Sequence, residues 1–470
     1  MAGPARKRLL LLEPPFHRLY SDSYGLKRFP LGLGYLAGAA RKLEGWSVGL
    51  YAADFHPDPD PFDQVYLAGE GYERYLRRLN DPSARVWKEL AGKVRDFNPD
   101  VVGITIKTPA LASAEITARL VKSIRPETLV VVGGPHASAM GGKLLERPCF
   151  DSVVMGQGEE ALVRLLTAVQ AGAKPPPLTP SPRFRDRISE TEALDRMEFP
   201  HLAARSCLID GQAYPAQAFG HVFTARGCPN NCSYCSSSVV WGRTVRTRSP
   251  RSVRLEIESL LALGVKRIHF DDDTFGPFPA RLKELCREIG SISPSFEFSC
   301  ETHVSLVSER NLEMMARAGC RMIQLGLESG DDAVLAANRK RTTAARALKA
   351  CQAVKRQGME LQVFFMAGLP QDTEQSLLAT LNLIRSVEMD KAIYSVFTPY
   401  PGTEAWRTCL ELGLVNEDYD FSLHNHQSPA NFFCPAVRPE RFRELAREME
   451  SAVREKNRAF RAKARARGEC

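Results

Sequence analysis

The stretch Cys228-Pro229-Asn230-Asn231-Cys232-Ser233-Tyr234-Cys235 places three thiols at a C-x-x-x-C-x-x-C spacing. It follows the extended run His221-Val222-Phe223-Thr224, so we expect it to form a loop at the end of a strand. Closely spaced thiolates suit soft metal centres and hold iron–sulfur clusters, whereas zinc sites usually add a second Cys or His pair, which is missing nearby. The spacing therefore predicts a [4Fe–4S] cluster on Cys228, Cys232 and Cys235, with one iron open to another ligand.

The same loop resembles the signature of the radical S-adenosylmethionine enzymes. In that family three cysteines hold the cluster, and the open iron binds the amino and carboxylate groups of S-adenosylmethionine. Reduction then cleaves the sulfonium to a 5′-deoxyadenosyl radical. The resemblance implies the same cofactors here, and it implies that Tyr234, at the family's aromatic position, contacts the adenine.

The second half of the chain alternates strands with helices. Extended segments are expected near Val222, Ile268, Phe296, Ile323, Val363 and Tyr394, and each but the last precedes an amphipathic helix. Such βα units predict a partial (β/α)6 TIM-like barrel, whose chemistry lies at the carboxyl ends of the strands. The cysteine loop follows the first of these strands, where the mouth of the barrel is expected.

Acidic side chains follow two of these strands. Asp271-Asp272-Asp273 closes the second strand, where the family binds the amino group of S-adenosylmethionine. Asp272 and Asp273 are candidates for that contact, and capping of a helix is the alternative. After the fourth strand, Glu328 and Ser329 lie in a G-x-E-S-G turn that resembles the family's ribose-binding turn.

Three further motifs follow strands of the barrel. Gly368 and Pro370, after the fifth strand, match the family's adenine-side G-L-P turn. Residues 398–403, after the sixth, resemble a string carried by cobalamin-dependent members. After the third strand, Cys300 and His303 are candidate catalytic residues, because a thiol and an imidazole can handle a proton or quench a radical. The alternative is a half-buried Cys and a polar rim His.

The first half also alternates apolar strands with helices. Strands are expected over residues 8–12, 47–51, 101–106, 129–132 and 153–155. This alternation predicts an α/β, doubly wound, Rossmann-like sheet whose ligands lie at the carboxyl ends of the parallel strands. A helix is expected over residues 114–124, with Ser113 as its N-cap.

This half resembles the cobalamin-binding domain that precedes the radical domain in a large subgroup of the family. The resemblance implies cobalamin contacts from residues in the turns: Gly32, Thr105, Gly133, Gly134, His136, Gly156, Gly158 and Glu159. The D-x-H-x-x-G motif, whose His binds cobalt from below in many cobalamin proteins, is missing after the first strand. We therefore expect no His below the cobalt, and packing or surface roles for His17, His56 and His136 rather than cobalt ligation.

Four segments are predicted. Prolines cluster over residues 175–182, which indicates a semi-rigid linker. From about residue 438 to about residue 467 the chain carries both charge signs, which favours a solvated capping helix. The segments are a cobalamin-binding domain over 1–172, a linker over 173–212, a radical domain over 213–410 and a helical region over 411–470.

Composition narrows the class of protein. Hydrophobic residues make up 44% of the chain, charged residues 25%, and the formal net charge is +8, which is typical of a globular protein. The early apolar run at 9–12 is too short for a signal peptide or a membrane span, and the 12 Cys are scattered apart from the one loop. We therefore expect a cytoplasmic location, no membrane span and no nucleic-acid partner.

Together these features predict a cobalamin-dependent radical S-adenosylmethionine methyltransferase. A methyl group would pass from S-adenosylmethionine via methylcobalamin to an unactivated substrate carbon, from which the 5′-deoxyadenosyl radical abstracts hydrogen. The alternative keeps the same cofactors but forms rings or rearranges carbon skeletons. A non-catalytic corrinoid or iron–sulfur sensor would need a partner-recognition module, and none is found. We expect a small-molecule or peptide substrate, an external electron donor such as flavodoxin or ferredoxin, and a monomer.

Overall fold

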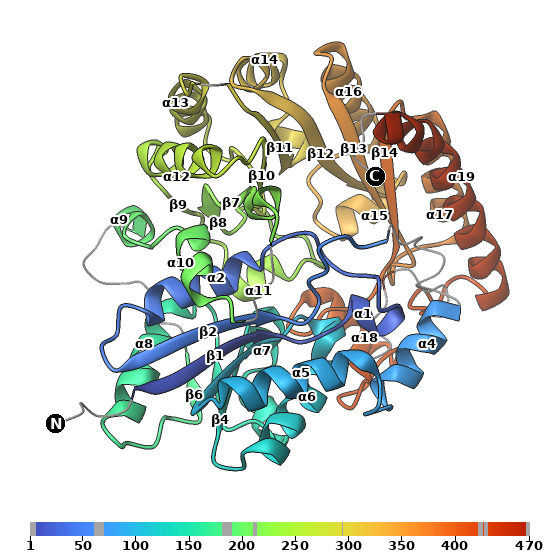
Figure 1. The fold of residues 1–470 in the computed structure, drawn as a ribbon. Helices are drawn as coiled ribbons and strands as arrows, with labels where there is room; N and C mark the ends of the chain where they lie inside the picture. Colours follow the sequence, from blue (N-terminus) through green and yellow to red (C-terminus); the bar gives the residue numbers. More distant parts are fainter. Residues whose placement is uncertain are drawn as a thin grey trace. The chain divides into compact units, whose positions relative to one another are not determined.

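The computed structural model describes residues 6–60, 70–180, 190–209, 214–293, 295–421, 426 and 431–466 (Figure 1). The chain divides into two compact units. The first comprises Met1–His221, Val239–Trp241 and Asp420–His424, and the second comprises Val222–Ser238, Gly242–Tyr419 and Asn425–Cys470.

The first unit is built on a six-stranded sheet in the order β2-β1-β3-β4-β5-β6, with every neighbouring pair parallel. Its strands are β1 (Lys7–Glu13), β2 (Trp46–Ala52), β3 (Val101–Thr105), β4 (Leu129–Gly133), β5 (Ser152–Val154) and β6 (Leu178–Thr179). The strand order reverses at β1 and β3, and doubly wound sheets bind their ligands outside the carboxyl ends of such strands. The predicted doubly wound sheet is confirmed.

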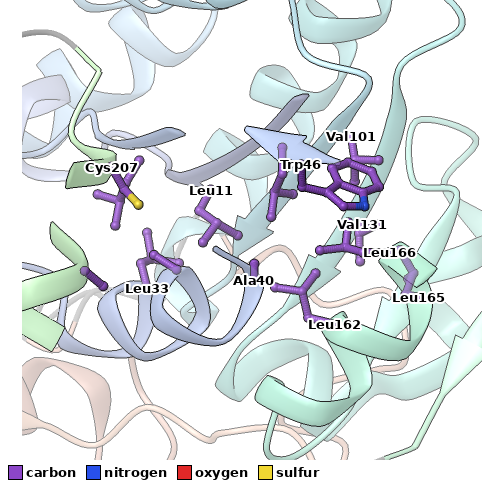
Figure 2. Close-up of a cluster of buried hydrophobic side chains, with 14 of the residues drawn as sticks. Leu11, Leu33, Ala40, Trp46, Val101, Val131, Leu162, Leu165, Leu166 and Cys207 are labelled. Atoms are coloured by element: carbon purple, nitrogen blue, oxygen red, sulfur yellow. The ribbon is translucent and has the colours of Figure 1, made fainter. Parts of the chain in front are cut away.

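Helices cover both faces of this sheet. They are α1 (His17–Tyr20), α2 (Leu31–Ala40), α4 (Glu70–Leu79), α5 (Arg85–Phe97), α6 (Leu111–Ile124), α7 (Pro135–Met140), α8 (Glu159–Gln170), α9 (Glu190–Asp195) and α10 (Pro200–Cys207). Figure 2 shows Leu11 of β1 among Leu33 of α2, Leu162 of α8 and Cys207 of α10. Because helices pack on both faces, β1 is buried on both sides and reads as an unbroken leucine run rather than an alternating one.

The predicted N-cap at Ser113 is wrong. The short 3-10 turn η1 (Thr108–Ala110) leads directly into α6, whose N-cap is Ala110. Ser113 therefore already lies inside the helix, where its buried hydroxyl donates a hydrogen bond to the carbonyl of Pro15. This bond joins α6 to the segment that follows β1.

Part of the expected linker is built into the first unit. The amides of Val153 and Met155 donate to the carbonyls of Pro177 and Thr179, so β6 adds to the sheet edge as a sixth strand. Prolines are tolerated at such an edge because their carbonyls still accept, although they have no N–H to donate. Helix α10, farther along the same segment, contributes Cys207 to the core.

The second unit contains a six-stranded sheet in the order β14-β13-β12-β11-β10-β7. The strands are β7 (His221–Val222), β10 (Arg267–Phe270), β11 (Glu297–Thr302), β12 (Cys320–Glu328), β13 (Glu360–Ala367) and β14 (Lys391–Val396). The pairs from β10 to β14 are parallel, and the order does not close on itself among the described strands. This open sheet confirms the predicted partial barrel.

Helices follow the strands of the second unit: α12 (Pro250–Ala262), α13 (Pro279–Gly290), α14 (Glu309–Arg317), α15 (Asp332–Ala337), α16 (Ala344–Arg356), α17 (Glu374–Ser386) and α18 (Glu404–Glu411). Several begin at a side chain that caps the first turn, as Ser249, Ser308, Thr343 and Thr403 do. The last strand is also followed by a helix, α18, which the sequence analysis did not expect.

The C-terminal helix α19 (Pro439–Ala466) packs against β14 and α17. Phe442, Leu445, Met449 and Val453 recur at helical spacing and are buried, so the helix has an apolar face as well as a charged one. It is therefore a docked element of the second unit rather than only a solvated cap.

Within the described residues no helix is long and apolar enough to cross a membrane.

Candidate cofactor site at the strand ends

The cysteine loop is fixed to the end of β10. The loop begins after the short strand β8 (Ala225–Arg226), and the amide of Gly227 donates to Asp273 Oδ2 at 3.0 Å. Next to it, Cys228 Sγ lies 3.0 Å from Thr274 Oγ1. The loop therefore sits at the carboxyl end of the second strand of the sheet, where the sequence analysis expected a site.

Asp272 anchors the chain just before this loop. Its Oδ1 accepts from the amides of Thr224 at 2.6 Å and Ala225 at 3.0 Å, and its Oδ2 accepts from the Thr224 hydroxyl. Burial raises the pKa of the Asp272 carboxyl to about 6, although these hydrogen bonds oppose the rise. Because both oxygens are already engaged, Asp273 is the better candidate for an ammonium group, and that role stays a prediction.

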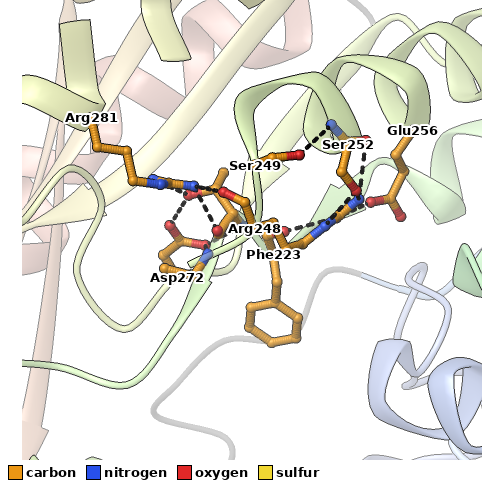
Figure 3. A network of polar contacts seen from close by, with 9 residues as sticks. Phe223, Arg248, Ser249, Ser252, Glu256, Asp272 and Arg281 are labelled. Carbon is orange, nitrogen blue, oxygen red and sulfur yellow. Dashed lines mark hydrogen bonds and ion pairs between the residues drawn. The ribbon is translucent and has the colours of Figure 1, made fainter. Parts of the chain in front are cut away.

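A buried charged network supports the same segment (Figure 3). Arg281 donates to the carbonyls of Thr224 and Arg248, and Arg248 donates to the carbonyl of Phe223. Arg248 also forms a buried ion pair with Glu256 of α12. Sequence reasoning missed Arg248, Glu256 and Arg281, because no motif marks them and only the folded chain brings them together.

The three thiols differ in their surroundings. Burial raises the pKa of Cys235 to about 12 and also raises the pKa of Cys232, where the positive charge of Lys340 opposes the rise. A bound metal would offset the cost of ionising these buried thiols, because a thiol that coordinates a metal is deprotonated outright. In the part of the chain that the structure describes, no three His, Cys, Asp or Glu side chains are grouped tightly enough for a single metal ion.

Glu328 is held at the end of β12. It has a φ of 66° beside a shift in the β12–β13 register, and its Oε1 lies 2.8 Å from Lys340 Nζ. A Cβ on Gly326 would stand 2.4 Å from that same oxygen and 2.8 Å from Nζ, so a side chain there would force the ends of these two side chains to shift. The sequence analysis identified Glu328 but not Lys340.

The turns after β12 and β13 are partly used for structure. Ser329 is buried and lies 3.2 Å from the Thr380 hydroxyl, so its side chain is tied to α17. After β13, the amide of Gly368 donates to buried Asp372 at 2.9 Å, and Pro370 is buried in the same turn. The predicted contacts of Ser329, Gly368 and Pro370 with S-adenosylmethionine stay predictions.

Cys300 and His303 are not brought together as a reactive pair. Cys300 is fully buried beside Cys320 and Cys286, and that burial raises its pKa well above the usual value. His303 Nε2 donates to the Lys340 carbonyl at 2.9 Å and its Nδ1 accepts from the Ser305 amide at 3.1 Å. Burial lowers the pKa of His303 to about 4, so it is a neutral, structural imidazole.

Glu301, between these two residues, is a further titratable group that sequence reasoning missed. It points to the opposite side of β11 from Cys300 because successive strand residues alternate. Desolvation by the surrounding protein, and then repulsion from Glu328, raise the pKa of Glu301 to about 7, although part of its side chain faces solvent. A carboxyl that titrates near neutral pH can exchange protons with a ligand. The only signal for Glu301 in the sequence would have been its position next to Cys300 in an expected strand, where successive side chains face opposite sides.

In the first unit, the predicted cobalamin residues other than Gly32 lie at or just after the carboxyl ends of β3, β4 and β5. Gly134, at φ 95°, lies against Thr105 and Ile106, where a Cβ would come within 3.1 Å of each. Gly156 has a φ of 70°, and its amide donates to Ser138 Oγ of α7 at 2.9 Å. Glycines in such turns let a backbone approach a large ligand closely.

His136 is buried at the start of α7, with Nδ1 3.2 Å from the Thr108 hydroxyl. Its Nε2 has no hydrogen-bond partner among the described residues. Burial lowers its pKa to about 3, so the ring is neutral. A buried ring nitrogen without a partner is the kind of group that a bound ligand satisfies.

Glu159 begins α8, Gly158 precedes it, and Gly32 lies in the first turn of α2. Gly32 faces open space, whereas a Cβ on Gly158 would meet Leu36. The loop after β1 is fixed by Asp54, which accepts from the amides of Phe16 and His17 and from His17 Nδ1 at 2.8 Å. His17 is thus engaged within the protein.

Comparison with known proteins gives a consistent result. Residues 222–384 match the model of the radical SAM superfamily, and residues 18–166 match the model of the B12 binding domain. An uncharacterized methyltransferase of Pyrococcus horikoshii is 28% identical over 364 residues, which cover 76% of this chain and 79% of the relative. The anaerobic magnesium-protoporphyrin IX monomethyl ester cyclase of Rubrivivax gelatinosus is 29% identical over 405 residues, which cover 80% and 68% of the two chains.

Among solved structures, the chain resembles the radical S-adenosylmethionine methyltransferase TsrM of Kitasatospora setae, solved with cobalamin and a [4Fe–4S] cluster bound. The TM-score is 0.68, and the match covers 95% of this chain and 89% of the other. At 17% identity this likeness shows a shared fold.

Proposed function

Because the chain belongs to the cobalamin-dependent radical S-adenosylmethionine enzymes, we propose that it is a methyltransferase acting on an unactivated carbon of a small molecule. The observation that carries the proposal is the pairing of a B12-binding domain with a radical domain in a chain that aligns along most of its length with a relative named a methyltransferase. Its electron donor would be an external low-potential protein such as flavodoxin or ferredoxin.

The cofactors are a [4Fe–4S] cluster, S-adenosylmethionine and cobalamin. When bound, they supply the 5′-deoxyadenosyl radical and the methyl group, and the protein supplies position and electrostatics. The residues present fit these groups. Cys228, Cys232 and Cys235 would hold the cluster, on a loop that is fixed at both its start and its middle.

The chain's own residues would divide the remaining work. Asp273 lies beside the cysteine loop and would accept hydrogen bonds from the ammonium group of S-adenosylmethionine. Glu328, oriented by Lys340, would accept from the ribose hydroxyls. In the first unit, the uncommitted Nε2 of His136 and the turns at Gly134 and Gly156 would contact cobalamin.

A second candidate function keeps these cofactors without methyl transfer. It is favoured by the similarity to a relative named a cyclase, which covers as much of the chain as the methyltransferase does. The two proposals differ in their products. Methyl transfer consumes one S-adenosylmethionine as methyl donor and a second as radical source, whereas ring formation needs only the second.

The test is a product count on anaerobically reconstituted protein supplied with cobalamin, S-adenosylmethionine and a low-potential reductant. Methyl transfer predicts S-adenosylhomocysteine up to about one equivalent per bound cobalamin before any substrate is added, because the corrinoid is the first methyl acceptor. 5′-Deoxyadenosine without S-adenosylhomocysteine would favour the cyclase reading. A variant with Cys228, Cys232 and Cys235 all changed to Ala should lose 5′-deoxyadenosine formation.

A further inference from the structure

Residues 338–340 connect the ends of several strands of the second unit. Asn338 accepts from the amide of Ser233 at 3.2 Å and, through Oδ1, from the Ser233 hydroxyl at 2.5 Å. Its Nδ2 donates to Gln371 Oε1 at 3.1 Å, in the turn after β13. Since Ser233 lies between Cys232 and Cys235, this segment holds the middle of the cysteine loop.

The same segment reaches three further strand ends. Arg339 forms an ion pair with Glu404 at the start of α18, and the carbonyl of Lys340 accepts from His303 Nε2 after β11. The side chain of Lys340 then turns to Glu328 after β12. A three-residue segment thus contacts four different turns as well as the cysteine loop.

The backbone of this segment is strained on both sides of Lys340. Arg339 has a φ of 53° and Arg341 a φ of 54°, a region that residues with a side chain rarely occupy. Such strain persists only where surrounding contacts over-determine the conformation, and it gathers at functional sites. Here it brings a lysine into the interior, where only 8% of its surface is exposed.

Lys340 remains charged in this position. Burial lowers the pKa of Lys340, but its ion pair with Glu328 outweighs burial and raises the pKa above the usual value. A buried ammonium group with a raised pKa is a permanent positive charge at neutral pH. This charge lies on the same short segment that is hydrogen-bonded to Ser233, which stands between Cys232 and Cys235.

We propose that Lys340 is a positioning residue that fixes Glu328 and places a permanent positive charge beside Cys232 and Cys235, so that the cluster bound there accepts an electron more readily. The proposal rests on the proposed cluster site and adds to it a residue that sets the reduction potential. Nearby positive charge stabilises the more negative, reduced state, and net charge is one of the factors that set cluster potentials. The electron comes from an external low-potential protein donor, Lys340 keeps its proton throughout, and no bond in the protein forms or breaks.

Glu328 gives the proposal a second, opposite test. Its carboxylate lies 2.8 Å from Lys340 Nζ and partly cancels the lysine's charge at the cluster. Removing the carboxylate while keeping the shape, in Glu328→Gln, should therefore shift the potential in the direction opposite to removal of the lysine charge. A purely structural ion pair would make no such prediction, because both substitutions would then disturb the same contact in the same way.

The experiment is an anaerobic redox titration of the reconstituted full chain, followed by the electron paramagnetic resonance signal of the reduced cluster. The proteins are wild type, Lys340→Met, Lys340→Arg, Glu328→Gln and the control Lys349→Met. Lys349 is an exposed lysine of α16 in the same unit. Iron and sulfide content are measured on each sample, so that a change in potential is separated from loss of the cluster.

We expect Lys340→Met to lower the midpoint potential so that the reduced-to-oxidised ratio at a fixed potential falls about tenfold, which for one electron is about 59 mV. Lys340→Arg keeps the positive charge and should have a midpoint potential close to that of wild type. Lys349→Met should match wild type, and Glu328→Gln should raise the midpoint potential. Full iron content with an unchanged midpoint in Lys340→Met overturns the proposal. If Lys340→Met does not retain iron, the sign of the Glu328→Gln shift decides: an increase supports the proposal, and no change or a decrease overturns it. A wild-type protein that binds no cluster would instead refute the proposed function.

Discussion

The carboxylate of Asp272 accepts a hydrogen bond from the Thr224 amide at 2.6 Å and so joins the end of β10 to the chain before the cysteine loop. Asp272 is 3% exposed, and a second buried amide, that of Ala225, depends on the same oxygen. The geometry of the cluster loop therefore depends on a carboxylate that does not itself belong to the loop.

The first prediction concerns this anchor. Asp272→Ala leaves two buried amides without a partner, which should lower the free energy of unfolding by about 1–3 kcal/mol for each. Asp272→Asn keeps one acceptor oxygen and should lose less. Urea denaturation measures both, with Asp96→Ala, at an exposed position of α5, as the control. If Asp272→Ala unfolds at the same urea concentration as the control, the hydrogen bonds to Asp272 do not contribute to the stability of the fold.

The second prediction concerns pH. The pKa of buried His136 falls from 6.5 to about 3, so the unfolded chain binds a proton that the folded chain does not. The contribution of neutral His136 to the free energy of unfolding is fully present above pH 6.5. It is lost as the pH falls, by about 2 kcal/mol between pH 6.5 and pH 5. His136→Gln should lose less stability than wild type over that interval, as measured by denaturation at both pH values. Parallel losses in the two proteins would show that His136 titrates normally.

The third prediction concerns Gly326. In Gly326→Ala the new methyl group meets the Glu328 carboxylate and the Lys340 ammonium, so both groups must move from the positions that they hold in the ion pair. The affinity for S-adenosylmethionine should fall by about tenfold or more, since a displaced hydrogen-bonding carboxylate costs about 1.5–3 kcal/mol. Isothermal titration of the reconstituted protein measures it. Gly92→Ala, in open space on α5, is the matched control and should keep wild-type affinity. Equal affinities in the two variants would remove Glu328 from the binding site.

The fourth prediction separates the two units. Gly134→Ala forces a side chain into a φ of 95° and against Thr105 and Ile106, at the turn proposed for cobalamin. Cobalamin content should fall while iron content stays at the wild-type level. Gly142→Ala, which meets nothing within 4 Å, should retain both. Loss of iron together with cobalamin in Gly134→Ala would point to general misfolding instead.

Much of the architecture was predictable from the sequence because hydrophobic periodicity and strand-end turns are local signals. The leucine run of β1 and the cysteine loop after β8 were both readable in this way. The N-cap prediction for Ser113 was wrong because serine's N-cap preference is a local signal. The preceding turn η1 leads directly into α6, so the helix has already begun before Ser113. The proline-rich stretch gave no sign of β6, because Pro177 and Thr179 join the sheet through their carbonyls, which accept from the amides of Val153 and Met155.

The site was predictable only where a motif names a residue. Glu328 was found from its turn, but Lys340 was not, because twelve residues and a helix separate the two in the chain. Cys300 and Glu301 show the same limit: alternation along β11 decides which of them faces the helices, and the motif gave no reason to prefer the exposed carboxylate to the buried thiol.

The most direct test of the account is the iron, sulfide and cobalt content of anaerobically reconstituted protein, measured beside the variant in which Cys228, Cys232 and Cys235 are all Ala. We expect about four irons and about one corrinoid per chain in the wild type, with iron lost and corrinoid kept in the variant. Full iron in the triple variant would contradict the proposed cluster site. Iron without corrinoid in the wild type, even with cobalamin supplied, would contradict methyl transfer.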